Sequence, residues 1–247
     1  MLYLIGLGLN EEGFSFEAFN AIKNSRKIYL EGYTVDFPYK VEKLEEKIMK
    51  KVKIVDRDFV ENQLGKIIVE AREMNIALLV YGAPLSATTH ITIIEEIRKK
   101  KIPYRVIQGA SIFDGIAETG LSLYKFGMTT SMPKWDPEKN FTPDSFIDVV
   151  VKNQSIDAHT LILIDIGLSF SKALDQLEKA MKSKKLEIPR MLVCSKIGTK
   201  QSSILCKSFK EYKKDKDSLD TDIKSPYCFV IPSDTLNQVE EDILKRF

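Results

Sequence analysis

Short apolar runs alternate with amphipathic segments along the first 110 residues of the chain. Runs of four to six residues, rich in Ile, Val, Leu and Tyr, occupy residues 2–7, 27–30, 52–55, 76–81 and 104–107. Apolar runs of this length are typical of buried strands. Apolar residues recur at helical spacing between them, as at Val41, Leu44 and Ile48 and at Ile91, Ile94 and Ile97. This alternation predicts a parallel sheet that is covered by helices on both faces.

The pattern changes near residues 110–120, where we expect a domain junction. Beyond it, apolar runs predict strands at residues 160–166, 191–194 and 228–231. Helical spacing predicts helices at residues 171–181 and 236–244. Residues 210–224 are dense in Lys and Asp and have few apolar positions, which predicts a solvated loop or a frayed helix. The whole pattern favours two α/β domains, residues 1–112 and 113–247.

Composition and charge narrow the functional classes. The chain has 247 residues, of which 44% are apolar and 29% are charged, as in an ordinary globular protein. Its formal net charge is only +2, which argues against a protein that binds nucleic acid mainly through its charge. The apolar run at residues 2–9 is too short to span a bilayer and lacks the basic start of a secretory signal. We therefore expect neither nucleic acid nor a membrane as a partner.

The cysteines point to a reducing compartment. Cys194, Cys206 and Cys228 are odd in number and none lies at C-x-x-C spacing. Neither a disulfide framework nor a zinc finger is predicted from such a set. Two histidines, His90 and His159, have no cluster of metal-ligating residues beside them in the sequence, so no metal site is expected. We expect a cytoplasmic protein.

Glycines follow the first predicted strand, where ligands bind in open α/β sheets. Gly6 and Gly8 match the start of a dinucleotide-binding fingerprint, but Glu11 stands where its third glycine belongs. Glu31 ends the second strand, at the place of a ribose-binding acid. Two interpretations stay open from these residues alone: a nicotinamide-dependent oxidoreductase, or a plain tight turn.

Small and hydroxyl-bearing residues follow the fourth and fifth predicted strands. Ser86, Thr88 and Thr89 offer hydrogen bonds to a ligand, although threonines here also suit helix capping. We expect His90, at the start of the next helix, to be a surface or capping residue rather than a catalyst. Ser111 likewise suits either a helix cap or a ligand contact.

Several of these segments together resemble the diphthine synthases. The similarity covers the opening MLYLIGLGL, then LEGYT at residues 30–34, GAPLSATTH at 82–90, IPYRVI at 102–107, ASI at 110–112, LYKFG at 123–127, HTL at 159–161 and Asp165-Ile166. The combination of ATTH with YKFG is specific, whereas a Gly-x-Gly pair alone is not. The similarity is clear from residue 1 to about 166 and weaker beyond.

The resemblance implies a fold and an activity. It implies two α/β domains of the tetrapyrrole methylase kind, with a parallel N-terminal sheet, a mixed C-terminal sheet and a cofactor cleft between the domains. The implied cofactor is S-adenosylmethionine, leaving as S-adenosylhomocysteine. The implied substrate is the modified histidine of translation elongation factor 2, methylated in diphthamide biosynthesis by a cytoplasmic homodimer.

The resemblance also assigns cofactor contacts by position. The contacts implied in the first domain are Leu9, Ala83, Ser86, Ser111 and Ile112. Those implied in the second are Ile164, Ile197 and Tyr227. The family has Asp where Ala83 stands and His where Tyr227 stands. The absent carboxylate at position 83 leaves open an alternative, a non-catalytic descendant that binds the elongation factor without methylating it.

Methyl transfer from a sulfonium to an amine needs neither a metal nor a protein nucleophile, because the positive charge already activates the donor. The protein has to align the neutral amine with the methyl group and exclude water. We therefore assign no catalytic base. Glu31, Tyr33 and Asp165 are candidates to orient the substrate amine.

Overall fold

The computed structural model describes residues 1–247, except for the side chains of Glu61, Asn62 and Leu64. The chain divides into two compact units, Met1–Gly115 and Ile116–Phe247, and each is described by itself. No helix in the described part of the chain is both long and apolar enough to cross a membrane.

The first unit is built on a five-stranded parallel sheet, as the alternating pattern predicts. Its strand order is β3-β2-β4-β1-β5. The strands are β1 (Leu2–Gly6), β2 (Lys27–Glu31), β3 (Lys53–Val55), β4 (Ile76–Val80) and β5 (Tyr104–Ile107). The central β1 pairs with β4 and with β5, so that Leu4 lies opposite both Leu78 and Val106. The carboxyl ends of β4, β1 and β5 therefore lie side by side.

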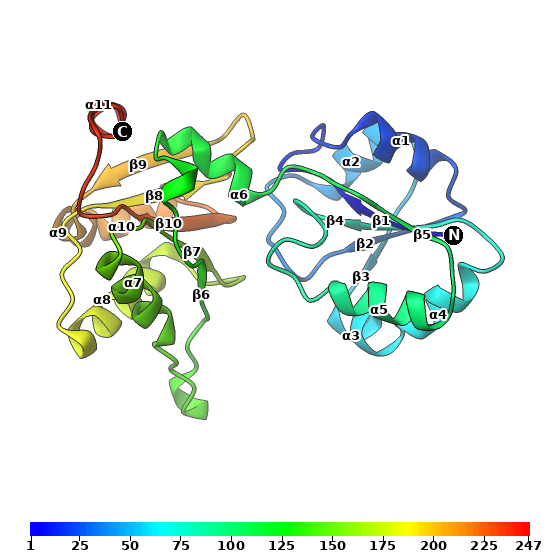
Figure 1. The fold of residues 1–247 in the computed structure, drawn as a ribbon, viewed down its shortest axis with the longest axis horizontal. Helices are drawn as coiled ribbons and strands as arrows, with labels where there is room; N and C mark the ends of the chain where they lie inside the picture. The colour runs from blue at the N-terminus through cyan, green and yellow to red at the C-terminus, as the bar shows by residue number, and fades with distance from the viewer. The chain divides into compact units, whose positions relative to one another are not determined.

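Helices cover both faces of this sheet (Figure 1). On one face lie α1 (Phe16–Lys23) and α2 (Val41–Ile48); on the other lie α3 (Arg57–Asn62), α4 (Leu64–Glu70) and α5 (Ile91–Lys99). Successive residues of β1 supply the two cores, because side chains alternate along a strand. Leu4 packs in the core beneath α4 and α5, whereas Ile5 packs in the core beneath α1 and α2. A one-turn helix, α6 (Ile112–Gly115), ends the unit.

The second unit has a mixed sheet of order β6-β7-β10-β8-β9. The strands are β6 (Thr130–Met132), β7 (Thr160–Ile164), β8 (Met191–Ser195), β9 (Ser203–Lys207) and β10 (Tyr227–Ile231). Only the pair β6–β7 is parallel; the other three pairs are antiparallel. This confirms the expected mixed sheet. The short β6 and the polar-ended β9 were not predicted, because neither forms a continuous apolar run.

A single large core lies under the helices of the second unit. The helices are α7 (Ser145–Ser155), α8 (Phe170–Lys184), α9 (Phe209–Lys214), α10 (Lys216–Asp222) and α11 (Gln238–Leu244), with short 3-10 turns at Ile116–Thr119, Leu123–Lys125 and Pro137–Lys139. Residues of α7, α8, α9 and α10 pack together with the sheet in that core. Predicted helices at 171–181 and 236–244 correspond to α8 and α11.

The prediction of a solvated segment at residues 210–224 is wrong. It forms α9 and α10, in which Tyr212 is fully buried and Leu219 is 8% exposed. The lysines that suggested solvation pair with acids instead, because Lys213 and Lys216 both contact Asp175 on α8, at 2.9 and 2.5 Å. The density of charged residues therefore gave no sign of these two helices, whose lysines form ion pairs with an acid on α8.

Candidate functional site

Three loops of the first unit converge at the carboxyl ends of β1, β4 and β5. Gly8 and Gly82 exchange backbone hydrogen bonds of 3.2 and 3.0 Å, which join the loops after β1 and β4. The hydroxyl of Tyr81 donates to the carbonyl of Leu9 at 2.9 Å and strengthens this junction. An added Cβ on Gly82 would meet Ala110 and Ser111 at 3.8 Å, so the loop after β5 lies beside the other two.

Glycine makes this approach possible because backbone fills the space of a side chain. A Cβ on Gly6 would lie 2.6 Å from the Gly82 carbonyl oxygen and 2.7 Å from the Gly109 nitrogen. A Cβ on Gly109 would lie 2.7 Å from the nitrogen of Gly8. These separations are shorter than any real side-chain contact, and the obstructing atoms are backbone. The surface formed here is thus one of peptide groups and small side chains.

The five residues predicted to contact a cofactor in this unit all lie on these loops. Leu9, Ala83 and Ser111 are buried, at 6–8% exposed, while Ser86 and Ile112 are half-buried. The structure thus brings the five positions together, and their role in binding stays a prediction.

Ser111 also has the capping role that the sequence left open. Its hydroxyl donates to Asp114 at 3.0 Å and accepts the amide of Phe113 at 3.2 Å. Its own amide donates to the same Asp114 oxygen at 2.7 Å. These bonds fix the start of α6 and hold the loop after β5 in one conformation.

His90 is 2% exposed, so the expectation of a surface residue is wrong. It does occupy the N-cap position of α5, as a capping residue would, but its side chain makes no hydrogen bond to that helix. Its Nε2 lies 2.8 Å from Oε2 of Glu31, whose side chain is fully buried at the end of β2. Neither Glu31 oxygen meets a donor in good hydrogen-bond geometry, so the pair is held mainly by charge. Nothing in the local pattern at 88–90 reveals this partner on another strand.

The surroundings of His90 favour its charged form. Nδ1 donates to the carbonyl of Pro84 at 3.0 Å, while Nε2 faces the carboxylate. Burial alone lowers the pKa of His90, but the Glu31 carboxylate and the Pro84 carbonyl together outweigh burial and raise that pKa above its ordinary value.

The second unit gathers its three predicted cofactor residues at one edge of its sheet. Ile164 ends β7, Ile197 follows β8, and Tyr227 begins the antiparallel β10. Tyr227 lies opposite Ser195, and Cys228 lies opposite Leu163, which fixes the three strand ends together. Ile197 and Tyr227 are buried and Ile164 is half-buried.

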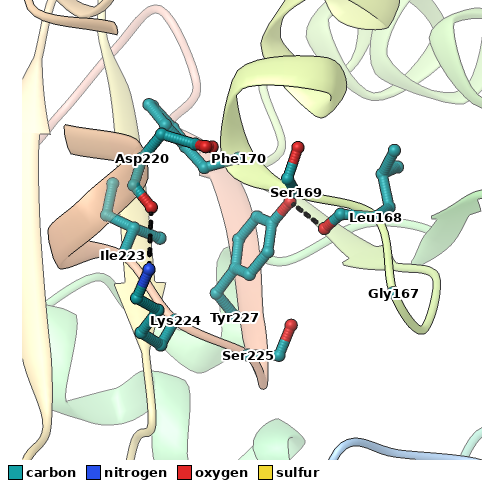
Figure 2. Close-up of a pocket in the computed structure, with 9 residues that line it drawn as sticks. All are labelled: Gly167, Leu168, Ser169, Phe170, Asp220, Ile223, Lys224, Ser225 and Tyr227. Atoms are coloured by element: carbon teal, nitrogen blue, oxygen red, sulfur yellow. Dashed lines mark hydrogen bonds between the residues drawn. The ribbon is translucent and has the colours of Figure 1, made fainter. Parts of the chain in front are cut away.

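Tyr227 also lines a pocket of about 250 Å³, which we call the Tyr227 pocket. Its lining residues are Gly167, Leu168, Ser169, Phe170, Asp220, Ile223, Lys224, Ser225 and Tyr227 (Figure 2). The hydroxyl of Tyr227 donates to the carbonyl of Leu168 at 2.9 Å, and burial raises the pKa of that hydroxyl. Lys224 Nζ donates to the carbonyl of Asp220 at 3.1 Å. The pocket therefore combines an apolar wall with one cationic side chain at its rim.

The other histidine, His159, is also buried beside a glutamate. Its Nε2 donates to Oε1 of Glu240 at 3.2 Å, while its Nδ1 accepts the amide of Ser233 at 2.8 Å. Burial lowers the pKa of His159, and the Glu240 carboxylate offsets this only in part. Glu240 additionally accepts the amides of Ser122 and Asn237, both at 2.9 Å. This pair ties the start of α11 to the segment before β7.

The three candidates to orient a substrate amine differ in access. Asp165 is exposed after β7 and accepts the amide of Lys134 at 2.9 Å. Tyr33 is half-buried and lines a second pocket, of about 370 Å³, together with Asp56, Asp58 and Phe59. Glu31 is buried against His90. Its burial leaves it unable to meet a substrate, or the ribose of a nicotinamide cofactor, in this conformation.

The comparison with known proteins gives a consistent family. The family of tetrapyrrole (corrin/porphyrin) methylases matches residues 1–211. The diphthine synthase of Methanococcus maripaludis is 36% identical over 99% of this chain and 98% of that one. The diphthine methyl ester synthase of Schizosaccharomyces pombe is 42% identical over 67% of this chain, a match that spans 58% of the relative's length.

The fold agrees with the sequence comparison. A crystal structure of a diphthine synthase superposes on the whole of this chain and on 95% of that one, with a TM-score of 0.88 and 27% identity. The two sheet topologies and the loop motifs therefore agree with the same family. This agreement favours a methyltransferase over a nicotinamide-dependent oxidoreductase. The chain belongs to the tetrapyrrole methylase family and, within it, to the diphthine synthases, and it is a methyltransferase of diphthamide biosynthesis.

Proposed function

We propose that this methyltransferase uses S-adenosylmethionine to methylate the modified histidine of translation elongation factor 2. The observation that carries the proposal is the convergence of the loops after β1, β4 and β5, which bear the five positions assigned to the cofactor by the family motifs. Backbone groups and small side chains there suit a ligand recognised through its hydrogen-bonding edges. The names of the relatives support the substrate.

The family motifs assign cofactor contacts within each unit. The contacts proposed are Leu9, Ala83, Ser86, Ser111 and Ile112 in the first unit and Ile164, Ile197 and Tyr227 in the second. S-adenosylmethionine supplies a methyl group on a positively charged sulfonium, already activated for displacement. The glycines let the backbones of the loops after β1, β4 and β5 approach one another closely, and the apolar walls of the Tyr227 pocket suit the exclusion of water.

The substrate amine has to be neutral, because an ammonium has no lone pair. Dry surroundings favour the neutral amine by lowering its pKa. We propose Tyr33 and Asp165 to orient it: Tyr33 lines a pocket and Asp165 is exposed at a strand end. The chemistry then depends on alignment rather than on a protein base.

Mass spectrometry of elongation factor 2 tests the proposal directly. After incubation with the protein and S-adenosylmethionine, the modified histidine should gain mass in steps of one methyl group. A matched control is Gly109→Ala, which forces a Cβ within 2.7 Å of the Gly8 nitrogen and should abolish the gain. An unchanged histidine with the wild-type protein contradicts the proposal.

The Ala83→Asp variant distinguishes an enzyme from a protein that binds the elongation factor without methylating it. A restored carboxylate offers one charge-assisted hydrogen bond, worth about 1.5–3 kcal/mol, or roughly 10- to 150-fold in affinity for the cofactor. Methylation by the variant but not by the wild type would identify this chain as a binding protein. Methylation by both supports the enzyme.

We propose in addition a homodimer that acts in the cytoplasm, as the family resemblance implies. Light scattering of the purified protein should give about twice the mass of one 28.2 kDa chain. A mass equal to one chain contradicts the dimer. Cell fractionation tests the compartment, and recovery of the protein in a membrane fraction contradicts it.

A further inference from the structure

The loop after β4 is held from two sides at Pro84. Its carbonyl oxygen accepts hydrogen bonds from Nδ1 of His90 and from the hydroxyl of Thr88, each at 3.0 Å. Its ring packs against the end of β1, since a Cβ on Gly6 would lie 2.9 Å from Pro84 Cδ. The residues on either side, Ala83 and Ser86, close a turn in which the Ser86 amide donates to the Ala83 carbonyl at 3.2 Å.

We propose that Glu31 and His90 form a positioning pair: one proton held between them fixes the loop that carries Ala83 and Ser86, and cofactor binding depends on that proton. This inference rests on the proposed function, because Ala83 and Ser86 are assigned to the cofactor only there. Neither Glu31 nor His90 touches the cofactor in this scheme. They act through the Pro84 carbonyl.

The proton follows from the chemistry of the two acceptors. A carbonyl oxygen and an ionised carboxylate only accept hydrogen bonds, so a ring placed between them needs a proton on each nitrogen. When the imidazolium releases one proton to solvent, one nitrogen is left with its lone pair facing an acceptor. Either the ring turns away or the Pro84 carbonyl loses one of its two donors, His90, and both outcomes loosen the loop.

The Glu31 carboxylate interacts with His90. In the described part of the chain, Glu31 on β2 is the titratable group that acts on His90, and the other polar group on the ring is the Pro84 carbonyl. The second carboxylate oxygen, Oε1, is buried without a hydrogen-bond partner among the described residues. Loss of the proton therefore leaves a buried carboxylate with no compensation, which favours the protonated pair.

Glu31→Gln removes the negative charge that favours the second proton on His90 but keeps almost the same side-chain shape. A glutamine amide can donate to Nε2 of a neutral His90, whose Nδ1–H then stays on Pro84. The loop remains held in this variant, and its hold no longer depends on pH. Glu31→Ala removes the partner altogether. A matched control is Glu95→Gln, the same chemical change on the exposed side of α5, where Glu95 pairs with Lys99 at 2.8 Å.

Calorimetric titration with S-adenosylhomocysteine from pH 6.5 to 9 measures the effect on binding. As pH rises through the titration of His90, the affinity of the wild type should fall roughly threefold to tenfold, the value of one hydrogen bond lost from the loop. Glu95→Gln should follow the wild type, and any titration of the ligand itself affects all proteins equally. Glu31→Gln should lack this fall. Identical pH profiles for wild type and Glu31→Gln overturn the proposal.

Two measurements without ligand keep the pair and the proposed function separate. Imidazole nitrogen shifts should show two protons on His90 at neutral pH in the wild type and one in Glu31→Gln. Hydrogen exchange of the Ser86 amide, corrected for its intrinsic pH dependence, should accelerate at high pH only in the wild type. These results without cofactor binding contradict the proposed function and leave the pair standing. Equal shifts and exchange in the two proteins overturn the pair.

Discussion

The two buried histidine–glutamate pairs shift the pKa of their histidines in opposite directions, although they consist of the same residue types. In the first unit, His90 Nδ1 donates to the Pro84 carbonyl while Nε2 faces the Glu31 carboxylate, and the pKa of His90 is raised. In the second, His159 Nδ1 accepts the Ser233 amide, so only Nε2 carries a proton. Each ring faces a carboxylate at Nε2, and the two differ in the backbone group at Nδ1, which is a carbonyl in the first unit and an amide in the second; this difference adds to the opposite pKa shifts.

The two carboxylates differ as much as the two rings. Glu240 accepts three N–H groups, from Ser122, Asn237 and His159. Burial raises the pKa of Glu240, but these donors outweigh it and lower the pKa overall. Among the described residues, Glu31 has the charged contact with His90 and no hydrogen-bond partner. A fully bonded carboxylate suits a structural role, whereas one that depends on a single proton can report on pH.

The largest expected effect of breaking either pair is at Glu240. Glu240→Ala leaves three N–H groups without their acceptor, and removal of one partner of a buried pair costs about 3–5 kcal/mol of folding free energy. Urea unfolding followed by Trp135, the single tryptophan, reports on the second unit, because Trp135 packs against its core. A midpoint within error of the wild type would show that the bonds to Glu240 contribute nothing.

Glu31→Ala should cost less, about 1–3 kcal/mol, since His90 can release its proton and remain a donor to Pro84. Circular dichroism follows both units in the same urea titration, whereas Trp135 fluorescence follows the second unit. The circular dichroism transition should therefore shift while the Trp135 transition, the internal control, should not move. A loss larger than that of Glu240→Ala would contradict the comparison of the two carboxylates.

The pKa of His90 predicts that the first unit loses stability as pH rises. Its folded pKa is raised, so the folded state binds more protons than the unfolded chain. The stabilisation is complete below the unfolded value of about 6.5 and is lost as pH rises through the folded pKa, by at most about 1.4 kcal/mol per pH unit. Thermal unfolding of wild type and Glu31→Gln between pH 5 and 9 measures the difference, which should shrink at high pH.

The pKa of His159 predicts the opposite sign in the second unit. Its folded pKa is lowered, so the stabilisation is present above the unfolded value of about 6.5 and is lost as pH falls through the folded pKa. Trp135 fluorescence during thermal unfolding between pH 4.5 and 7.5 should show this loss. His159→Asn lacks the titrating ring, and a pH dependence equal to that of the wild type would contradict the assignment.

The smallest expected effect on stability is that of Glu31→Gln at neutral pH. Its amide keeps a contact with His90, so we expect a change below about 1 kcal/mol. The same substitution at Glu240 should cost more, because its amide would face the Asn237 N–H at the start of α11. Urea unfolding of both variants tests this order directly.

Much of the fold follows from the sequence because its strands and helices are marked locally. All five strands of the first unit begin within one residue of the predicted runs, from β1 at Leu2 to β5 at Tyr104. Several missed elements lack that local mark: β6 is three residues long, and α9 and α10 show a charged surface. Their stability comes from partners elsewhere, such as Asp175 on α8 for Lys213. Helix α7 was also missed, although Phe146, Ile147 and Val150 form a buried face on it.

The candidate site, like the fold, could be predicted from the sequence only in part. The glycine loops and the family motifs identify the positions proposed for the cofactor, and the parallel topology explains why they meet at one edge. The motif GAPLSATTH contains His90 but not its partner. Glu31, at the end of another strand, was considered for a ribose or a substrate amine, and its pairing with His90 appears only when β2 and β4 lie side by side.

The sequence by itself determined the order of strands and helices, the glycine turns and the membership of a methyltransferase family, because each depends on residues that are neighbours along the chain. Only the tertiary structure decided in which direction the pKa of each histidine shifts. Each shift depends on groups that the fold brings within 3.2 Å of the rings: a carbonyl, an amide and two carboxylates. The pKa of a side chain depends on the groups around it, and those groups come together only when the chain folds.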